Sequence, residues 1–196
     1  MARAEGRPLA LGAVAGAAAH HSFELASGVG LVLQPELGLG RSAAVWVGQF
    51  GGWALLTRRR GRLADAVLAV LAGASLSGVG VHFVLWSWRK GPGGLPLLTE
   101  AEGLTPGQLP AYNAILWFWA TTAAGSLALE TPRRSRRWAL LGLVTLPVFV
   151  VSARHHFDWV KEQAVGNPAW WNRGLRPVSP SDQGRAAGTN ERSSAS

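Results

Sequence analysis

Long apolar segments separated by short polar or basic stretches are the feature that most limits how this chain can fold. The segments cover residues 9–33, 43–57, 63–88, 111–129 and 138 to at least 152. A helix needs about 20 mostly apolar residues to cross the hydrocarbon core of a bilayer. Most of the segments approach or exceed that length, and the short second segment can be extended back to Leu39. The pattern predicts an all-α fold, a polytopic transmembrane bundle of about five spanning helices in the cell membrane.

The composition agrees with an integral membrane protein. Charged residues make up only 15% of the chain, whereas soluble domains carry about 25%. There are ten Trp residues against one Tyr and six Phe, and Trp favours the interface between membrane and water. The absence of Cys excludes disulfides, iron–sulfur clusters, zinc sites built on thiolates and thiol catalysis.

The positive charge is concentrated in short stretches, and these predict the orientation. Two Arg-rich loops cover residues 58–62 and 133–137, and the N-terminus carries Arg3 and Arg7. Positive charge on short loops marks the cytoplasmic side, and five spans place all three stretches on that side. The five-span arrangement therefore predicts an N-terminus inside the cell and a C-terminus outside. The net charge of +8 is therefore assigned to orientation and to anionic head groups of the bilayer, and no recognition motif indicates nucleic acid.

The chain divides into a transmembrane domain over residues 1–165 and a tail over residues 166–196. The start of the tail contains Trp170 and Trp171 and reads as an interfacial patch. From about Pro177 onward Ser, Gly, Arg and Pro dominate, which predicts disorder. An alternative interpretation of the N-terminus is a signal peptide cleaved after Ala19.

Small residues and one proline predict how the helices pack. Gly12 and Gly16 are spaced four apart, as are Gly73 and Ser77, and such pairs allow two helices to approach closely. Gly51-Gly52 offers a further position of the same kind. Pro147 should kink the last apolar segment, because it removes one helical hydrogen bond.

Histidines and carboxylates inside the apolar segments are the candidate site. His21-Ser22-Phe23-Glu24 and His155-His156-Phe157-Asp158 share the order His, any residue, Phe, acid. Residues three or four apart share a helix face, so Glu24 can pair with His21 or His20, and Asp158 can pair with His155. Each such pair can present an imidazole and a carboxylate to one point. Ionisable groups at membrane depth are costly and are functional candidates by default. The candidate catalytic groups are His21, Glu24, His155 and Asp158, and the two pairs are predicted to converge.

The same histidines are also candidate metal ligands, namely His20, His21, His82 and His156. The set is rich in His and poor in carboxylates, which suits copper or zinc better than a di-iron centre bridged by carboxylates. Histidines on separate helices can also ligate a haem. The alternatives are structural: the residues around His155 can form a cluster at head-group level, and His82 can be interfacial.

These features favour a small membrane-embedded enzyme that acts on a lipophilic substrate, such as an isoprenoid or a lipid. The His and carboxylate pairs would then act as acid and base or as ligands of a transition metal. A haem or copper protein for electron transfer or metal handling is the second hypothesis. A non-catalytic membrane subunit or a proton-coupled transporter is the third.

Overall fold

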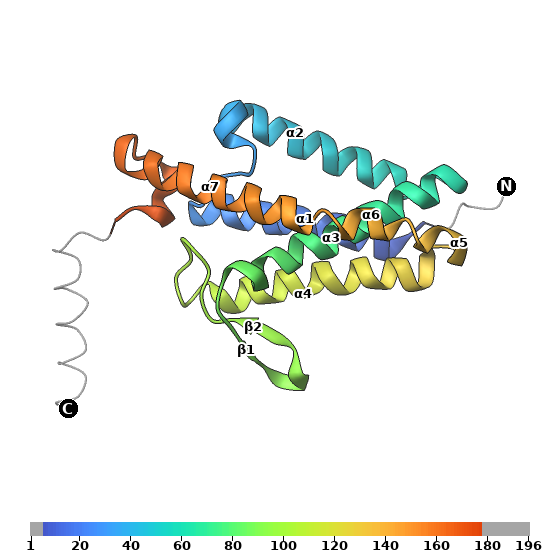
Figure 1. Ribbon diagram of the computed structural model, residues 1–196. Helices are drawn as coiled ribbons and strands as arrows, with labels where there is room; N and C mark the ends of the chain where they lie inside the picture. Colours follow the sequence, from blue (N-terminus) through green and yellow to red (C-terminus); the bar gives the residue numbers. More distant parts are fainter. Residues whose placement is uncertain (1–5, 178–196) are drawn as a thin grey trace.

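The computed structural model describes residues 6–177 and is mostly helical, which confirms the all-α fold. Successive long helices run in opposite directions (Figure 1). The elements are α1 (Pro8–Ser27), α2 (Gln34–Leu56), α3 (Arg62–Leu85), α4 (Leu109–Gly125) with its wider last turn η2 (Ser126–Glu130), and the run α5 (Arg133–Arg136), α6 (Ala139–Leu143) and α7 (Leu146–Gly166).

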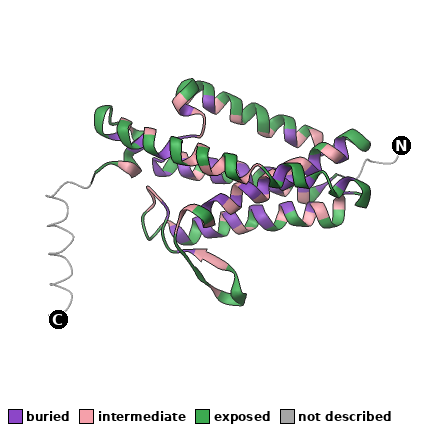
Figure 2. Ribbon diagram, viewed as in Figure 1, coloured by how far each residue is buried: buried purple, intermediate pink, exposed green. Residues whose placement is uncertain are grey.

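Two stretches of the described chain are long and apolar enough to cross a membrane, Arg62–Leu85 and Arg133–Gly166. The larger number of spans expected from the sequence therefore stays a prediction. The core lies between α1, α3 and α4, whereas the outward faces of α2 and of the last run are largely exposed (Figure 2). In the most apolar 18-residue stretch of the last run, only 11% is buried. Its exposed large apolar side chains include Leu140, Leu141, Val144, Val148 and Val151.

Helix α1 packs closely on α4, as the spacing of Gly12 and Gly16 predicted. A Cβ atom on Gly16 would lie 2.7 Å from the Cα atom of Trp119, and one on Gly12 would lie 2.8 Å from a methyl group of Thr122. These distances are shorter than carbon atoms tolerate, so the contact needs glycine at both positions. It brings the polar side chains of α1 against α4.

Helices α3 and α6 are in equally close contact. A Cβ atom on Gly73 would lie 2.1 Å from the carbonyl oxygen of Ala139, and one on Gly142 would lie 2.1 Å from that of Val70. By contrast, a Cβ atom on Gly51 or on its neighbour Gly52 would meet nothing within 4 Å, so the described structure does not use that pair for packing.

The last run is interrupted just before Pro147, as predicted. Pro147 has no N–H to donate to the carbonyl oxygen of Leu143, four residues earlier. The hydroxyl of Ser77 on α3 donates to that oxygen at 2.9 Å and also lies 3.1 Å from the oxygen of Gly142. The break therefore frees a carbonyl that holds α3 against the last run.

One end of the bundle collects the start of α1, the turn between α2 and α3, and the Arg-rich α5 (Figure 1). There Arg7 and Asp65 form a buried ion pair. The start of α1 is capped by the carboxylate of Glu130, which accepts the backbone N–H groups of Leu9 and Ala10 at 2.7 and 2.8 Å.

The opposite end carries the loop after α3, which the sequence did not resolve into elements. It contains an antiparallel hairpin of β1 (Trp88–Lys90) and β2 (Pro96–Leu98) around a short turn, η1 (Pro92–Gly94). Asn113 on α4 binds the hairpin through the backbone N–H and carbonyl of Leu98.

The chain after α7 folds back against the same end. It forms η3 (Trp170–Leu175), in which Trp171 stacks on Trp159 with 5.6 Å between ring centroids. The backbone N–H of Gly174 donates to the carbonyl oxygen of Gly28 at the end of α1. The predicted disordered tail, residues 178–196, lies outside the described residues.

Candidate functional site

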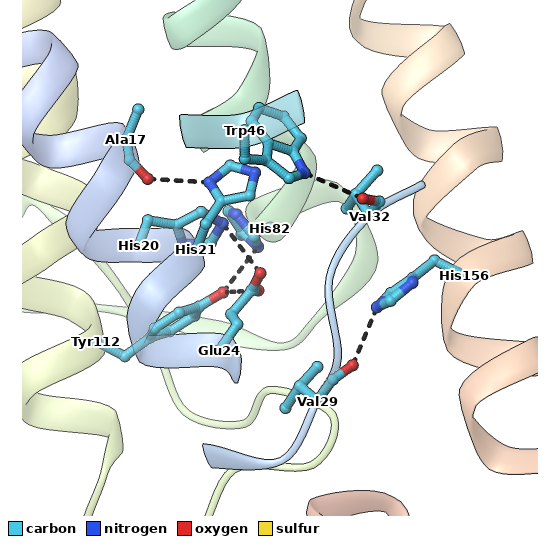
Figure 3. Close-up of polar contacts among 10 residues, drawn as sticks. All are labelled: Ala17, His20, His21, Glu24, Val29, Val32, Trp46, His82, Tyr112 and His156. Atoms are coloured by element: carbon cyan, nitrogen blue, oxygen red, sulfur yellow. Dashed lines mark hydrogen bonds and ion pairs between the residues drawn. The ribbon is translucent and has the colours of Figure 1, made fainter. Parts of the chain in front are cut away.

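Polar side chains from α1, α3, α4 and α7 meet toward the end of the bundle that carries the hairpin (Figure 3). A cavity of about 160 Å³ lies among α1, α2, α3 and α7. Its wall is largely apolar and aromatic, and its ionisable lining residues among those described are His20, His21, Glu24, His82 and His156. All five are buried.

Glu24 is the centre of the hydrogen-bonded group. Tyr112, which is fully buried, donates its hydroxyl to Oε1 of Glu24 at 2.6 Å. The Nε2 atom of His20, one helical turn before, lies 3.3 Å from Oε2. Each carboxylate oxygen therefore has one partner, and these partners come from α1 and α4.

His82 extends this group to α3. Its Nδ1 atom lies 3.4 Å from the hydroxyl oxygen of Tyr112. Because that hydroxyl already donates to Glu24, the geometry assigns the proton to Nδ1 of His82, which donates to the phenolic oxygen. The ring stacks on Trp86 at 5.1 Å and lies edge-on to His20 at 4.8 Å between centroids.

His21 lies on the neighbouring part of the wall. Its Nδ1 atom donates to the carbonyl oxygen of Ala17 at 2.9 Å. Its ring lies 4.0 Å from Trp46 of α2, centroid to centroid, and the indole N–H of Trp46 donates to Val32. Of the two histidines expected near Glu24, the ion-pair contact is made by His20 and not by His21.

His156 comes to the cavity from α7. Its Nε2 atom donates to the carbonyl oxygen of Val29 in the loop after α1 at 3.0 Å (Figure 3). Gly30 in this loop has φ of +82°, and a Cβ atom there would lie 3.2 Å from the ring of His156. The loop thus needs glycine both for its backbone conformation and for the approach of this imidazole.

Several buried nitrogens have no hydrogen-bond partner in the part of the chain that the structure describes. In the cavity wall they are Nδ1 of His20, Nε2 of His82, Nδ1 of His156 and Nε1 of Trp119. A buried polar atom without a partner costs about 1–3 kcal/mol. Such atoms among the residues that line one cavity indicate a site for a polar group or an ion.

His155 and Asp158 are not part of this site, and the predicted convergence with the first pair is wrong for them. The imidazole of His155 is 63% exposed and lies 3.4 Å from Glu36, and the carboxylate of Asp158 is 75% exposed, 3.9 Å from Lys161. Because His155 and Asp158 are three residues apart, they do share a helix face, but this face of α7 is exposed and points away from the cavity. His156, turned by about 100° along the helix, faces the cavity instead.

Tyr112 and Trp119 are the site residues that sequence reasoning did not assign. The sequence offers a signal for Tyr112: in a five-span arrangement it begins the fourth apolar segment on the side of the membrane where the third segment ends near His82. Trp119 follows two turns later on α4, and its ring stacks on His20 at 5.3 Å between centroids. Which face of α4 meets α1 was the missing information.

Comparisons with known proteins return no match: no family model, no curated protein and no solved structure is significantly similar to this chain. The function is therefore argued from the site alone.

Proposed function

We propose that the protein is a multi-pass membrane protein, with about five helical stretches crossing the bilayer. The support is the alternating direction of the long helices and the exposed apolar faces of α2 and of the run Arg133–Gly166. The Arg-rich end of the bundle would then face the cytoplasm. The site lies toward the opposite end, in the outer half of the membrane.

Within this bundle the protein acts as an enzyme on a lipophilic substrate. The observation that carries this proposal is the cavity, in which an apolar aromatic wall surrounds a few convergent polar groups. That combination is typical of small-molecule sites. A cavity of about 160 Å³ holds a group of roughly the size of benzene. One isoprene unit or the end of an acyl chain would therefore fit, with the rest of the substrate lying between helices.

The hydrogen-bonded group supplies acid and base chemistry. An unprotonated ring nitrogen of His20 or His82 accepts a proton from the substrate, and Glu24 stabilises the positive charge that this places on the ring. Tyr112 holds Glu24 in position. In a site that excludes water these charge interactions are stronger than in solution.

Metal handling is the second candidate, and one observation favours it. His20, Glu24 and His82 each offer a ligand atom, and the three atoms lie within 4.8 Å of one another. The small volume of the cavity favours a single ion over a haem, since pockets for ligands of that size start at about 300 Å³.

The test of the enzyme proposal compares lipids before and after incubation. Purified wild type is reconstituted into vesicles of a total lipid extract supplemented with isoprenoid alcohols, and the lipids are profiled by mass spectrometry. We expect one species to be consumed and one to appear with wild type, and neither change with Glu24→Gln.

Glu36→Gln is the matched control, because its carboxylate is 54% exposed and contacts only the exposed His155 among the groups described above. It should behave as wild type. Identical profiles for wild type and for a correctly folded Glu24→Gln variant would overturn the proposal.

A further inference from the structure

A group of three potential ligands is built into the wall of the cavity from two helices. It consists of His20 and Glu24 on α1 and His82 on α3. One ring nitrogen of each histidine and one oxygen of Glu24 lie within 4.8 Å of one another. The Nε2 atom of His20 and Oε2 of Glu24 are 3.3 Å apart.

These distances fit a metal ion after a small adjustment. Metal–ligand bonds of about 2.0–2.1 Å place neighbouring ligand atoms about 3–3.5 Å apart. The Nε2 atom of His20 and the Oε2 atom of Glu24, both on α1, already have this separation. The third ligand has to approach by about 1.8 Å at most, which rotation of a side chain provides.

The charges around the group also favour a cation. Glu24 is the only carboxylate among the described residues that line the cavity, and no Lys or Arg lines it. A buried carboxylate needs a positive partner or a proton. Of the histidines, His82 has a buried Nε2 atom with no partner in the described structure, so it is available to an ion.

The surroundings of the group resemble the outer shell of a metal site. Ligating histidines usually donate their second N–H to an oxygen, and ligating carboxylates accept a further hydrogen bond. Tyr112 does both here, since its oxygen faces Nδ1 of His82 and its hydroxyl donates to Glu24. Tyr112 is therefore a positioning residue for two of the three ligands.

From this geometry we infer that His20, Glu24 and His82 bind one divalent first-row transition-metal ion, with open coordination positions facing the cavity. Two imidazoles and one carboxylate suit zinc or iron, whereas magnesium and calcium prefer oxygen ligands. Three protein ligands and an open position are typical of catalytic sites. His21 and His156, which the sequence also offered as ligands, do not belong to this group of described residues.

The inference rests on the proposed function and changes its chemistry, because the ion would occupy the ring nitrogens named there as the base and would itself polarise the substrate as a Lewis acid. Its test needs no substrate. The purified full-length protein is stripped with a chelator, dialysed against Zn²⁺ and analysed for metal content, and Co²⁺ is used as a spectroscopic probe. We expect one zinc per chain and visible d–d absorption bands with cobalt.

Variants locate the site. His82→Gln and Glu24→Gln should bind zinc at least ten-fold more weakly, and Tyr112→Phe should weaken binding by about 10- to 100-fold while keeping the stoichiometry. His155→Gln removes an exposed imidazole from α7 and should bind as wild type. If His82→Gln does not fold, the change of the cobalt spectrum in Tyr112→Phe tests the same site.

A wild type that takes up no stoichiometric zinc or cobalt overturns the inference, as does unchanged affinity in His82→Gln. The metal site and the enzyme proposal can fail independently of each other. Zinc binding without any change in the lipid profile would support the metal site and refute the enzyme. Turnover that depends on Glu24 without metal binding would refute the metal site and leave acid and base catalysis.

Discussion

The hydrogen bond from Tyr112 to Glu24 joins α4 to α1, and its removal should weaken the fold measurably. Tyr112→Phe deletes one oxygen from a fully buried ring and leaves its packing unchanged. The deleted hydroxyl donates at 2.6 Å, and a hydrogen bond to a charged group contributes about 1.5–3 kcal/mol. Because the site is buried, no solvent molecule readily replaces it. We expect the free energy of unfolding to fall by about 1.5–3 kcal/mol.

The measurement is a reversible denaturant titration in detergent micelles, followed by far-ultraviolet circular dichroism. Thr121→Val is the matched control, since it also removes one hydroxyl from α4 without changing the shape of the side chain. The hydroxyl of Thr121 is exposed, and within the described residues it donates only to carbonyl oxygens of its own helix, those of Trp117 and Phe118. This variant should stay within about 0.5 kcal/mol of wild type.

Two results would refute the reasoning. If Tyr112→Phe unfolds at the same denaturant concentration as wild type, the hydrogen bond does not hold the helices together. If Thr121→Val lowers the free energy of unfolding as much as Tyr112→Phe does, the loss does not come specifically from the contact with Glu24.

Further predictions concern packing, charge and ligand binding. Gly142→Ala should lower the free energy of unfolding by about 1–3 kcal/mol, because the added Cβ would meet a carbonyl oxygen of α3. Gly51→Ala, where the added Cβ meets nothing, should raise the free energy of unfolding by up to about 1 kcal/mol. Equal effects of the two substitutions in a denaturant titration would contradict the close contact between α3 and α6. Asp65→Asn leaves its buried arginine partner without a counter-ion and should cost about 3–5 kcal/mol in a denaturant titration, and a loss below about 1 kcal/mol would mean that the pair is solvated. Zinc at about 100 times its Kd should raise the free energy of unfolding of wild type by about 2.7 kcal/mol, reversibly with a chelator, and no rise would argue against binding to the folded state. Asp158→Asn should leave lipid turnover in the vesicle assay unchanged, because the carboxylate of Asp158 is exposed. Loss of turnover in this variant would show that Asp158 does take part in the reaction.

Much of the fold could be predicted from the chain alone. Apolar length and the Arg-rich loops indicated the helical stretches and the common end for the basic segments. The glycine spacing on α1 and α3 indicated close contacts, and Pro147 indicated the break before α7. These features are local, because each depends on residues within one or two helical turns.

The candidate site was predicted in part. His20, Glu24, His82 and His156 line the cavity as ionisable groups in apolar segments should, since burying such groups without a partner is costly. The partnerships within the site were also predicted in part. Of the two imidazoles expected near Glu24, that of His20 makes the contact and that of His21 does not. The second stretch contributes His156 to the cavity, while His155 and Asp158 lie outside.

The physical reason is that sequence spacing determines which residues share a helix face but not which way that face points. His155 and Asp158 keep the predicted common face, and the rotation of α7 turns it outward. That rotation depends on contacts with distant segments, such as Gly142 against α3 and His156 against Val29. The sequence by itself indicated apolar helices that carry several imidazoles and carboxylates. Only the tertiary structure decided that Glu24, Tyr112 and His82, which come from three helices, meet at one point.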